Sequence, residues 1–225
     1  DWSGYTVLPG LIDGNTHLLG DIQSNDPLAP IKATWEEDVS LGAANALKTL
    51  KAGFTSVIDV GSYRAFTDVA LSDAINTGEL PGPRMLVAGA YVTVSGGGGE
   101  VGGGKTDVII PDEFRRGVAD SSGEVRSHVR DLIAGGADFI KMIATGAVLT
   151  VGTEPGEAEF TEAELRAAAE DAANFGKYVI ATAHCPDPVN QPIKDALPPL
   201  PHGLLNHDQS LTTSKPQGDR VAPGS

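Results

Sequence analysis

A short apolar stretch near the start of the chain ends in residues that could bind a metal. The run from Val7 to Ile12 is interrupted by Pro9-Gly10 and leads into polar residues that include Asn15 and His17. Alternate side chains of a β-strand point to the same side, so positions 15 and 17 are expected to share one face. An imidazole is a preferred zinc ligand, and His17 is therefore a candidate ligand. Asn15 would be a poor, neutral one.

A glycine-rich tract further along supplies a competing motif. Gly99-x-x-x-x-Gly104-Lys105-Thr106 satisfies the phosphate-binding loop pattern and follows a predicted strand. Such a loop should lead directly into a helix whose N-terminus receives the anion. The residues that follow, 107–111, are instead β-branched and end in a proline. We expect 95–105 to be an irregular loop, with nucleotide binding as a minor alternative.

Helix and strand signals alternate along most of the chain and would position these residues. Capping-box patterns begin three predicted helices, at Thr34-x-x-Glu37, Ser121-x-x-Glu124 and Thr161-x-x-Glu164. A fourth helix is predicted at about 65–76. Besides the N-terminal stretch, strands are predicted at 54–60, 84–94, 138–143 and 177–184. Strands alternating with helices are typical of parallel βαβ units. We therefore expect an α/β fold, an incomplete TIM-like (β/α)8 barrel of about five to six βα units.

The last 40 residues differ from the rest in composition. Eight of the 15 prolines lie there, and periodic hydrophobic patterns disappear. Pro198-Pro199-Leu200-Pro201 excludes a helix and removes hydrogen-bond donors from any strand at that position. We expect residues 1–185 to form the partial barrel and residues 186–225 to form a Pro-rich irregular tail.

Several of these segments carry a family resemblance. Pro9-Gly10-Leu11-Ile12-Asp13 followed by His17 resembles the opening motif of the amidohydrolase superfamily, Pro-Gly-Leu-Ile-Asp-x-His-x-His. Asn15 stands where that motif has its first histidine. Segments 53–61, 81–85, 137–142 and 179–184 look like the second to fifth barrel strands of the family. The nearest branch contains Xaa-Pro dipeptidase-like, arginine carboxypeptidase-like and ochratoxin-hydrolysing enzymes, which cleave an amide bond next to a free carboxylate.

The resemblance implies a metal site. Its ligand positions in this chain are His17, Lys141, His184 and His207, although the residues around His207 depart from the family pattern. In the family the lysine is carboxylated and bridges two metals. One or two zinc ions are implied, with weak occupancy expected because Asn15 replaces a histidine. Without the resemblance, each residue has a simpler interpretation: a loop cap for His17, a salt-bridging lysine for Lys141, and a hydrogen-bonded core histidine for His184.

The resemblance also implies a substrate loop at Gly96, Gly97, Gly98 and Gly99, where many relatives have Gly-Gly-His-Gly. A substrate-side histidine is therefore missing. The family's catalytic aspartate belongs to the eighth strand, for which this sequence has no counterpart. The catalytic base consequently stays unassigned.

The composition and net charge of the chain disfavour some classes of binding partner. The chain has 225 residues, 40% of them hydrophobic, and a formal net charge of −14. That charge disfavours nucleic acid and anionic membranes. No apolar run is long enough for a transmembrane helix. An unclosed barrel leaves strand edges unpaired, so self-association is expected.

The predicted function is metal-dependent hydrolysis of an amide or peptide-like C–N bond in a small amide or dipeptide-like substrate. The main alternative is a catalytically inactive barrel fragment that acts as a scaffold or partner. The sequence does not assign a cellular compartment.

Overall fold

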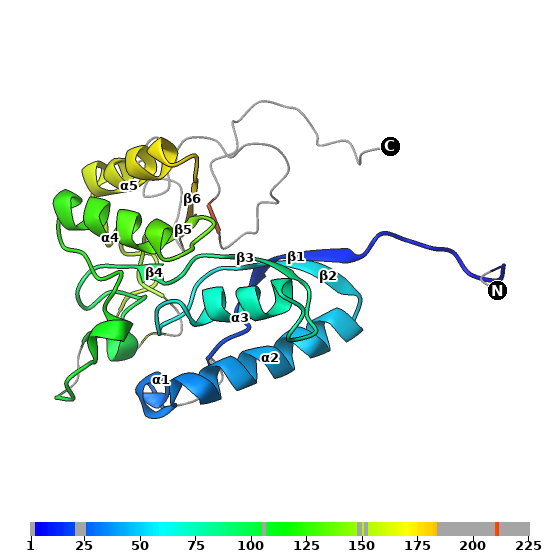
Figure 1. Cartoon of the computed structure of the whole chain (residues 1–225). Coiled ribbons are helices and arrows are strands. Elements are labelled where there is room, and N and C mark those ends of the chain that lie inside the picture. Colours follow the sequence, from blue (N-terminus) through cyan, green and yellow to red (C-terminus); the bar gives the residue numbers. More distant parts are fainter. Residues whose placement is uncertain are drawn as a thin grey trace.

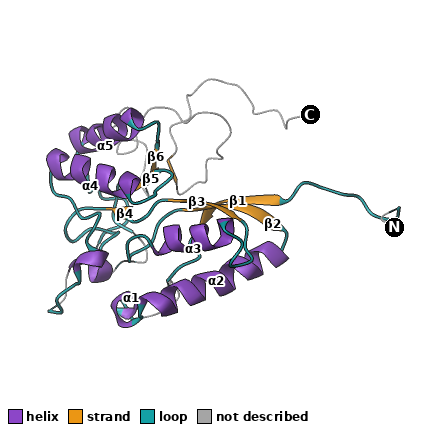
Figure 2. Cartoon of the chain, viewed as in Figure 1, coloured by secondary structure: helices purple, strands orange, loops and turns teal. Residues whose placement is uncertain are grey.

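The computed structural model describes residues 3–20, 26–104, 107–147, 150, 153–183 and 210–211. Within them, strands and helices alternate along the chain (Figures 1 and 2). The elements are β1 (Leu11–Thr16), α1 (Ala29–Lys32), α2 (Trp35–Lys51), β2 (Phe54–Asp59), α3 (Thr67–Asn76), β3 (Arg84–Val87), β4 (Tyr91–Val92), the 3₁₀ helices η1 (Val101–Gly104) and η2 (Asp112–Phe114), α4 (Ser122–Ala134), β5 (Ile140–Ile143), α5 (Glu162–Asn174), β6 (Val179–Thr182) and β7 (Ser210–Leu211).

Two of the three predicted capping boxes are confirmed at atomic detail, whereas at Ser121 the hydroxyl accepts from the Glu124 N–H but the Glu124 carboxylate accepts from the N–H of Asp120. The Thr34 hydroxyl accepts a hydrogen bond from the backbone N–H of Glu37 at 3.2 Å, and the Glu37 carboxylate accepts from the backbone N–H of Thr34 at 2.8 Å. Thr161 and Glu164 form the same reciprocal pair at the start of α5. These bonds satisfy backbone donors that lack intrahelical partners, so the local sequence alone positions the helices.

The strands form two neighbouring parallel ladders. One has the order β1-β2-β3 and the other the order β4-β5-β6-β7, in which β7 is antiparallel to β6. Asp138 links the two ladders, since its backbone N–H donates to the carbonyl of Val87 at 2.8 Å. The parallel α/β class is therefore confirmed. β7 pairs within the segment predicted to be an irregular tail, which the proline content did not reveal.

The strand predicted over 84–94 is divided into β3 and β4. The backbone N–H groups of Ala88 and Gly89 donate to the buried carboxylate of Asp68 at 3.1 and 2.8 Å. Gly89 also has a φ of 78°, a conformation that glycine adopts at little cost. Because these donors are used by Asp68, the ladder stops after Val87 and resumes at Tyr91.

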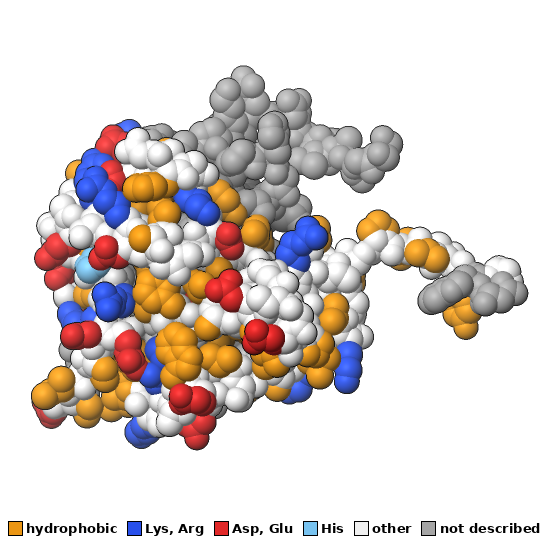
Figure 3. Space-filling model, in the orientation of Figure 1, with side chains coloured by type: hydrophobic (Ala, Val, Ile, Leu, Met, Phe, Trp, Pro, Cys, Tyr) orange, Lys and Arg blue, Asp and Glu red, His pale blue; other side chains and the backbone are white. Residues whose placement is uncertain are grey.

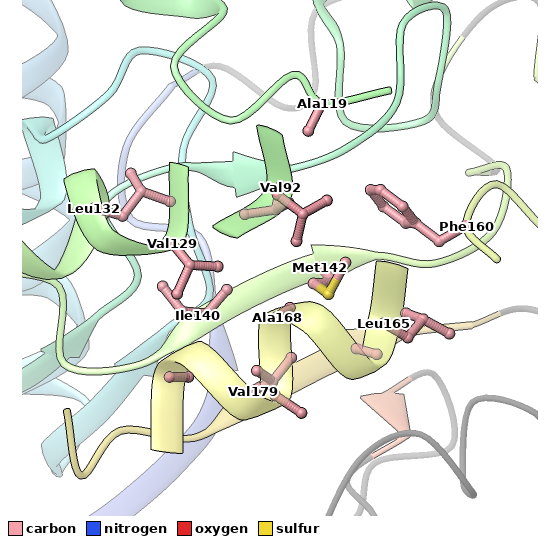
Figure 4. Close-up of a cluster of buried hydrophobic side chains, with 14 of the residues drawn as sticks. Val92, Ala119, Val129, Leu132, Ile140, Met142, Phe160, Leu165, Ala168 and Val179 are labelled. Carbon is pink, nitrogen blue, oxygen red and sulfur yellow. The ribbon is translucent and has the colours of Figure 1, made fainter. Parts of the chain in front are cut away.

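The two faces of the sheet have different roles. Alternate residues Val57, Met85 and Val87 pack with α2 and α3 residues such as Ala46 and Leu71. The corresponding residues of β4, β5 and β6 pack under α4 and α5 in the largest buried cluster (Figure 4). The residues between them, Ile58, Leu86 and Ile180, belong to a third cluster. The helices therefore cover one face, and the third cluster marks the other, inner face.

The start of the chain is apolar and exposed. Residues 3–8 extend away from the other described segments, and Tyr5, Val7 and Leu8 are all exposed (Figures 1 and 3). Leu11 and Ile12 of β1 are 52% and 66% exposed, and β1 lies at the edge of its ladder. Among the helices of the described residues, none has the length and apolar character needed to cross a membrane.

Candidate functional site

His17 follows directly after β1 and is fixed through one ring nitrogen. Its Nδ1 lies 3.2 Å from the carbonyl oxygen of Gly61, and the Tyr91 hydroxyl lies 3.0 Å from the same nitrogen. Burial lowers the pKa of the imidazole; the Gly61 carbonyl opposes this shift, and the charge of Lys141 adds to it. A neutral imidazole held at Nδ1 leaves Nε2 free to bind a cation.

The backbone before His17 does not follow the regular strand alternation that the sequence predicts. The pairing of β1 with β2 shifts between Asp13 and Thr16, where three residue steps on β1 match two on β2, from Val57 to Asp59. Such a bulge changes the side-chain alternation. The expectation that positions 15 and 17 share a face therefore does not follow from spacing alone.

Lys141 lies in the middle of β5 and is 2% exposed. Its neighbours Ile140 and Met142 belong to the helix-covered cluster, so the lysine points to the inner face. Its Nζ is buried and has no hydrogen-bond partner among the described residues. Burial lowers the pKa of the amine to about 7. Within the part of the chain that the structure describes, Lys141 therefore forms no salt bridge of the kind that the simpler interpretation implies.

The structure brings His17 and Lys141 together from distant parts of the chain. Tyr91 is the register partner of Lys141 on the adjacent strand, and Lys141 is in turn the register partner of Ile180. Because paired residues point to the same side, these three side chains form one row on the inner face. Tyr91 contacts His17, which places the imidazole beside this row. His184 and His207 lie outside the described residues.

Sequence reasoning missed Tyr91. Its ring packs edge-to-face against Tyr63, with ring centroids 5.3 Å apart, and against His17, with centroids 6.0 Å apart. The nearest available signal was its place in a predicted strand, just before the glycine tract. The Gly61 carbonyl could not have been predicted, because a backbone acceptor has no sequence signature.

The glycine loop lies against the same region. A Cβ added at Gly99 would come within 2.9 Å of Ile143 and 3.1 Å of Tyr91. One at Gly98 would come within 2.8 Å of Ala147. Ile143 follows Lys141 by two residues on the same face, so the loop passes next to the row formed by Tyr91 and Lys141. Only residues without side chains fit this close approach.

Acidic and hydroxyl side chains hold the loop in place. Gly96 N–H donates to Glu100 at 2.6 Å, Gly98 N–H donates to Glu159 at 2.7 Å, and Gly99 N–H donates to Thr93 at 3.1 Å. A phosphate-binding loop would present the N–H groups of 99–106 to its ligand. Here the Gly99 N–H is already bonded to Thr93 and the Glu100 N–H to the carbonyl of Gly97, which argues against the nucleotide-binding alternative. Lys105 and Thr106 of that motif lie outside the described residues.

Glu159 combines this structural bond with an unusual protonation. Burial raises the pKa of its carboxyl to about 7, while hydrogen bonds from Gly98 and Thr93 partly offset the shift. Its Oε2 is buried without a well-formed hydrogen bond. Glu159 is therefore a titrating group that holds the substrate-loop candidate, and no sequence motif pointed to it.

The family-implied metal can be tested against these residues. Within the described ranges, no three His, Cys, Asp or Glu side chains gather as a ready metal site. The described part of the site nevertheless offers a neutral imidazole with a free Nε2 and a buried amine whose nitrogen lacks a partner. Both features suit a cation-binding pocket, so the residues present fit a metal.

Comparison with known proteins gives a consistent result. The model of the Amidohydrolase family matches residues 6–197. Ochratoxinase from Aspergillus niger is 29% identical over 225 residues, covering 94% of this chain and 46% of its own length. The chain thus spans about half the length of the curated relatives it matches.

Solved structures also resemble this chain. A Xaa-Pro dipeptidase with bound methionine has a TM-score of 0.71 at 33% identity, over 84% of this chain and 46% of the other. The A. niger ochratoxinase structure has a TM-score of 0.72 at 28% identity, over 84% and 45% of the two chains. A prolidase complexed with N-methylphosphonate-L-proline has a TM-score of 0.68 at 31% identity, over 80% and 44%.

Proposed function

This chain belongs to the amidohydrolase family, and from that premise we propose that it takes part in metal-dependent hydrolysis of an amide or dipeptide-like C–N bond. The observation that carries the proposal is the meeting of His17 and Lys141 on the inner face, with Tyr91 between their strands. The named relatives, an ochratoxinase and a Xaa-Pro dipeptidase, support a substrate of the amide or dipeptide class.

His17 and Lys141, together with His184 and His207, would hold the metal. His17 would bind through Nε2, because Nδ1 is engaged by Gly61 and Tyr91. Lys141 in its neutral form has a free lone pair, whereas the ammonium form has none. A neutral amine can also add CO2, releasing one proton and forming an anionic carbamate that provides oxygen ligands. Asn15 would contribute little, so a single zinc ion is expected rather than two.

A bound divalent metal would act as a Lewis acid and lower the pKa of a water molecule. The residues of this chain would supply the surroundings. The glycine loop at 96–99, fixed by Glu100 and Glu159, would border the substrate and limit its size on that side. The rings of Tyr63 and Tyr91 would offer an apolar wall next to His17.

A non-catalytic scaffold is the second candidate. Two observations favour it: Asn15 replaces a family ligand, and β1 is an edge strand with Leu11 and Ile12 exposed. An exposed apolar edge strand can pair with another chain. We propose that the protein self-associates through this edge, and sedimentation velocity of wild type and Ile12→Lys would measure the change in oligomer size.

Metal analysis and turnover distinguish the two candidates. We expect about one equivalent of zinc per chain after zinc loading and gel filtration, and release of the amine product from dipeptides with a free C-terminal carboxylate. A chelator should remove both. His17→Gln and Lys141→Met should each reduce bound zinc at least about tenfold.

His128→Gln is the matched histidine control, because His128 lies on α4 on the helix-covered face. It should keep the zinc content of the wild type. Asn15→His should raise zinc occupancy. If folded wild-type protein retains no zinc and releases no amine, the hydrolase proposal is wrong and the scaffold is the better explanation.

A further inference from the structure

The hydrogen bond between His17 and Tyr91 has a direction that the neighbouring backbone decides. His17 Nδ1 lies 3.2 Å from the Gly61 carbonyl and 3.0 Å from the Tyr91 hydroxyl. A carbonyl oxygen only accepts hydrogen bonds. A favourable contact with Gly61 therefore requires the proton on Nδ1. The hydroxyl oxygen of Tyr91 then shares this proton as a second acceptor.

If the Tyr91 hydroxyl accepts the Nδ1–H of His17, it still has its own proton to donate. Among the described residues, His17 is the one hydrogen-bond partner found for the Tyr91 hydroxyl. In the described part of the chain, the Nζ of Lys141, which is the register partner of Tyr91 on the adjacent strand, also has no hydrogen-bond partner. The phenol thus retains an O–H donor on the inner face, in the same row of side chains as Lys141. An unpaired donor in such a place is costly unless a ligand or water accepts it.

The tyrosine ring is held firmly enough to aim this donor. Gly61 has a φ of 104°, and a Cβ there would lie 2.9 Å from the Tyr91 ring. Gly99 approaches the ring from the loop, where a Cβ would lie 3.1 Å from Tyr91 Cβ. Tyr63 packs edge-to-face against the ring at 5.3 Å. A donor fixed by its surroundings stabilises a developing charge without having to reorganise.

We propose that Tyr91 accepts the Nδ1–H of His17 and donates its own O–H to an anionic oxygen of the ligand, so that it positions the imidazole and binds substrate at once. The inference rests on the proposed function for the identity of the ligand. The oxygen belongs to a carboxylate or to the tetrahedral oxyanion that forms when water adds to an amide carbonyl. Tyr91 would thereby supply a donor on the side of the site bordered by a loop that lacks a histidine.

The first test reads the direction of the bond without any ligand. Nitrogen NMR of protein labelled with ¹⁵N-histidine distinguishes the Nδ1–H tautomer from the Nε2–H tautomer, and His17→Gln assigns the signal. We expect the Nδ1–H tautomer in metal-free wild type. The same tautomer should persist in Tyr91→Phe, because the Gly61 carbonyl remains. An Nε2–H signal in wild type would overturn the inference, since Tyr91 would then donate to His17.

The second test measures the donor. Calorimetric titration of zinc-loaded protein with N-methylphosphonate-L-proline, which carries anionic oxygens on a tetrahedral centre, should show binding at least about tenfold weaker in Tyr91→Phe. Zinc affinity should change by less than about threefold, which separates donor loss from damage to His17. Tyr178→Phe is the control, because it removes the hydroxyl of a tyrosine that stacks on Phe139 and is not among the residues assigned to the site.

Equal binding of the phosphonate by wild type and Tyr91→Phe would overturn the donor role. A folded, zinc-loaded wild type that does not bind the phosphonate would overturn the proposed function and the ligand role of Tyr91 with it. The nitrogen spectrum would still decide the direction of the His17–Tyr91 bond in that case.

Discussion

Two buried ionisable residues, Asp68 and Lys141, have opposite surroundings. Asp68 is fully buried at the start of α3, and its carboxylate accepts three backbone N–H bonds, from Val69 at 2.8 Å, Ala88 at 3.1 Å and Gly89 at 2.8 Å. Lys141 is equally inaccessible, yet its Nζ has no hydrogen-bond partner in the part of the chain that the structure describes. The helix-covered region therefore provides hydrogen bonds for the buried carboxylate of Asp68. Among the described residues, the inner face provides none for the buried amine of Lys141.

The different surroundings indicate a structural role for Asp68 and a functional role for Lys141. Burial raises the pKa of Asp68 to about 6, a shift that its three N–H bonds restrain. Burial lowers the pKa of Lys141 to about 7 without any opposing interaction. A residue that costs stability in the folded protein is typical of a site prepared for a ligand. The comparison predicts opposite signs for removing the two groups.

Asp68→Ala should show the largest effect. It removes the acceptor of three N–H groups, two of which lie in the buried turn between β3 and β4, so we expect a loss of about 3 kcal/mol in the free energy of unfolding. Urea denaturation followed by circular dichroism measures it. Asp73→Ala, an exposed aspartate on the same helix, is the matched control and should change stability by less than about 0.5 kcal/mol. A loss below about 1 kcal/mol for Asp68→Ala would remove the contrast.

Lys141→Met should stabilise the metal-free protein in bicarbonate-free buffer. The folded pKa lies below the unfolded value of 10.5, so below about pH 7 folding must bury a proton-bearing amine and loses stability. Each pKa unit corresponds to about 1.4 kcal/mol, and we expect a gain of about 2 kcal/mol or more at pH 6.

The pH dependence of that gain is its signature. Between pH 7 and 10.5 the unfolded chain holds a proton that the native protein lacks, so wild-type stability rises with pH in this window. The difference between Lys141→Met and wild type should therefore shrink as pH rises through it. A variant less stable than wild type at pH 6 would mean that Lys141 has a stabilising partner.

Glu159→Gln should have the smallest effect. The pKa of Glu159 is raised from 4.5 to about 7, so between these values the native protein binds a proton that the unfolded chain does not. Wild-type stability should fall as pH rises through this window, and the glutamine variant should lack that part of the slope. Because the side chain is partly exposed, the difference should stay below about 1 kcal/mol. Identical pH profiles of thermal unfolding would show that Glu159 titrates normally.

Local sequence signals predicted most of the fold. The Thr34 and Thr161 capping boxes begin α2 and α5 as expected, and the alternation of helices and strands correctly gave a parallel α/β class. Both signals arise within a few residues, where backbone donors and apolar faces must be satisfied locally. The family assignment also followed from sequence, since motifs such as 9–13 and 137–142 encode strand ends.

Long-range bonds account for the departures. The break between β3 and β4 depends on Asp68, 20 residues before Ala88, and the pairing of β6 with β7 joins residues far apart in the chain. The candidate site shows the same limit. His17 and Lys141 were selected from sequence, whereas Tyr91, Glu159 and the Gly61 carbonyl became visible only through their contacts.

The amino-acid sequence by itself determined where the helices begin, which segments form parallel strands, and which residues could bind a metal, because each depends on residue type and short spacing. Only the tertiary structure decided that Lys141 is buried with no partner among the described residues and that His17 is held through Nδ1, because burial and hydrogen bonding depend on segments brought together by the fold. The chemistry of the site depends on these tertiary features, the burial of Lys141 and the hydrogen bonding of His17.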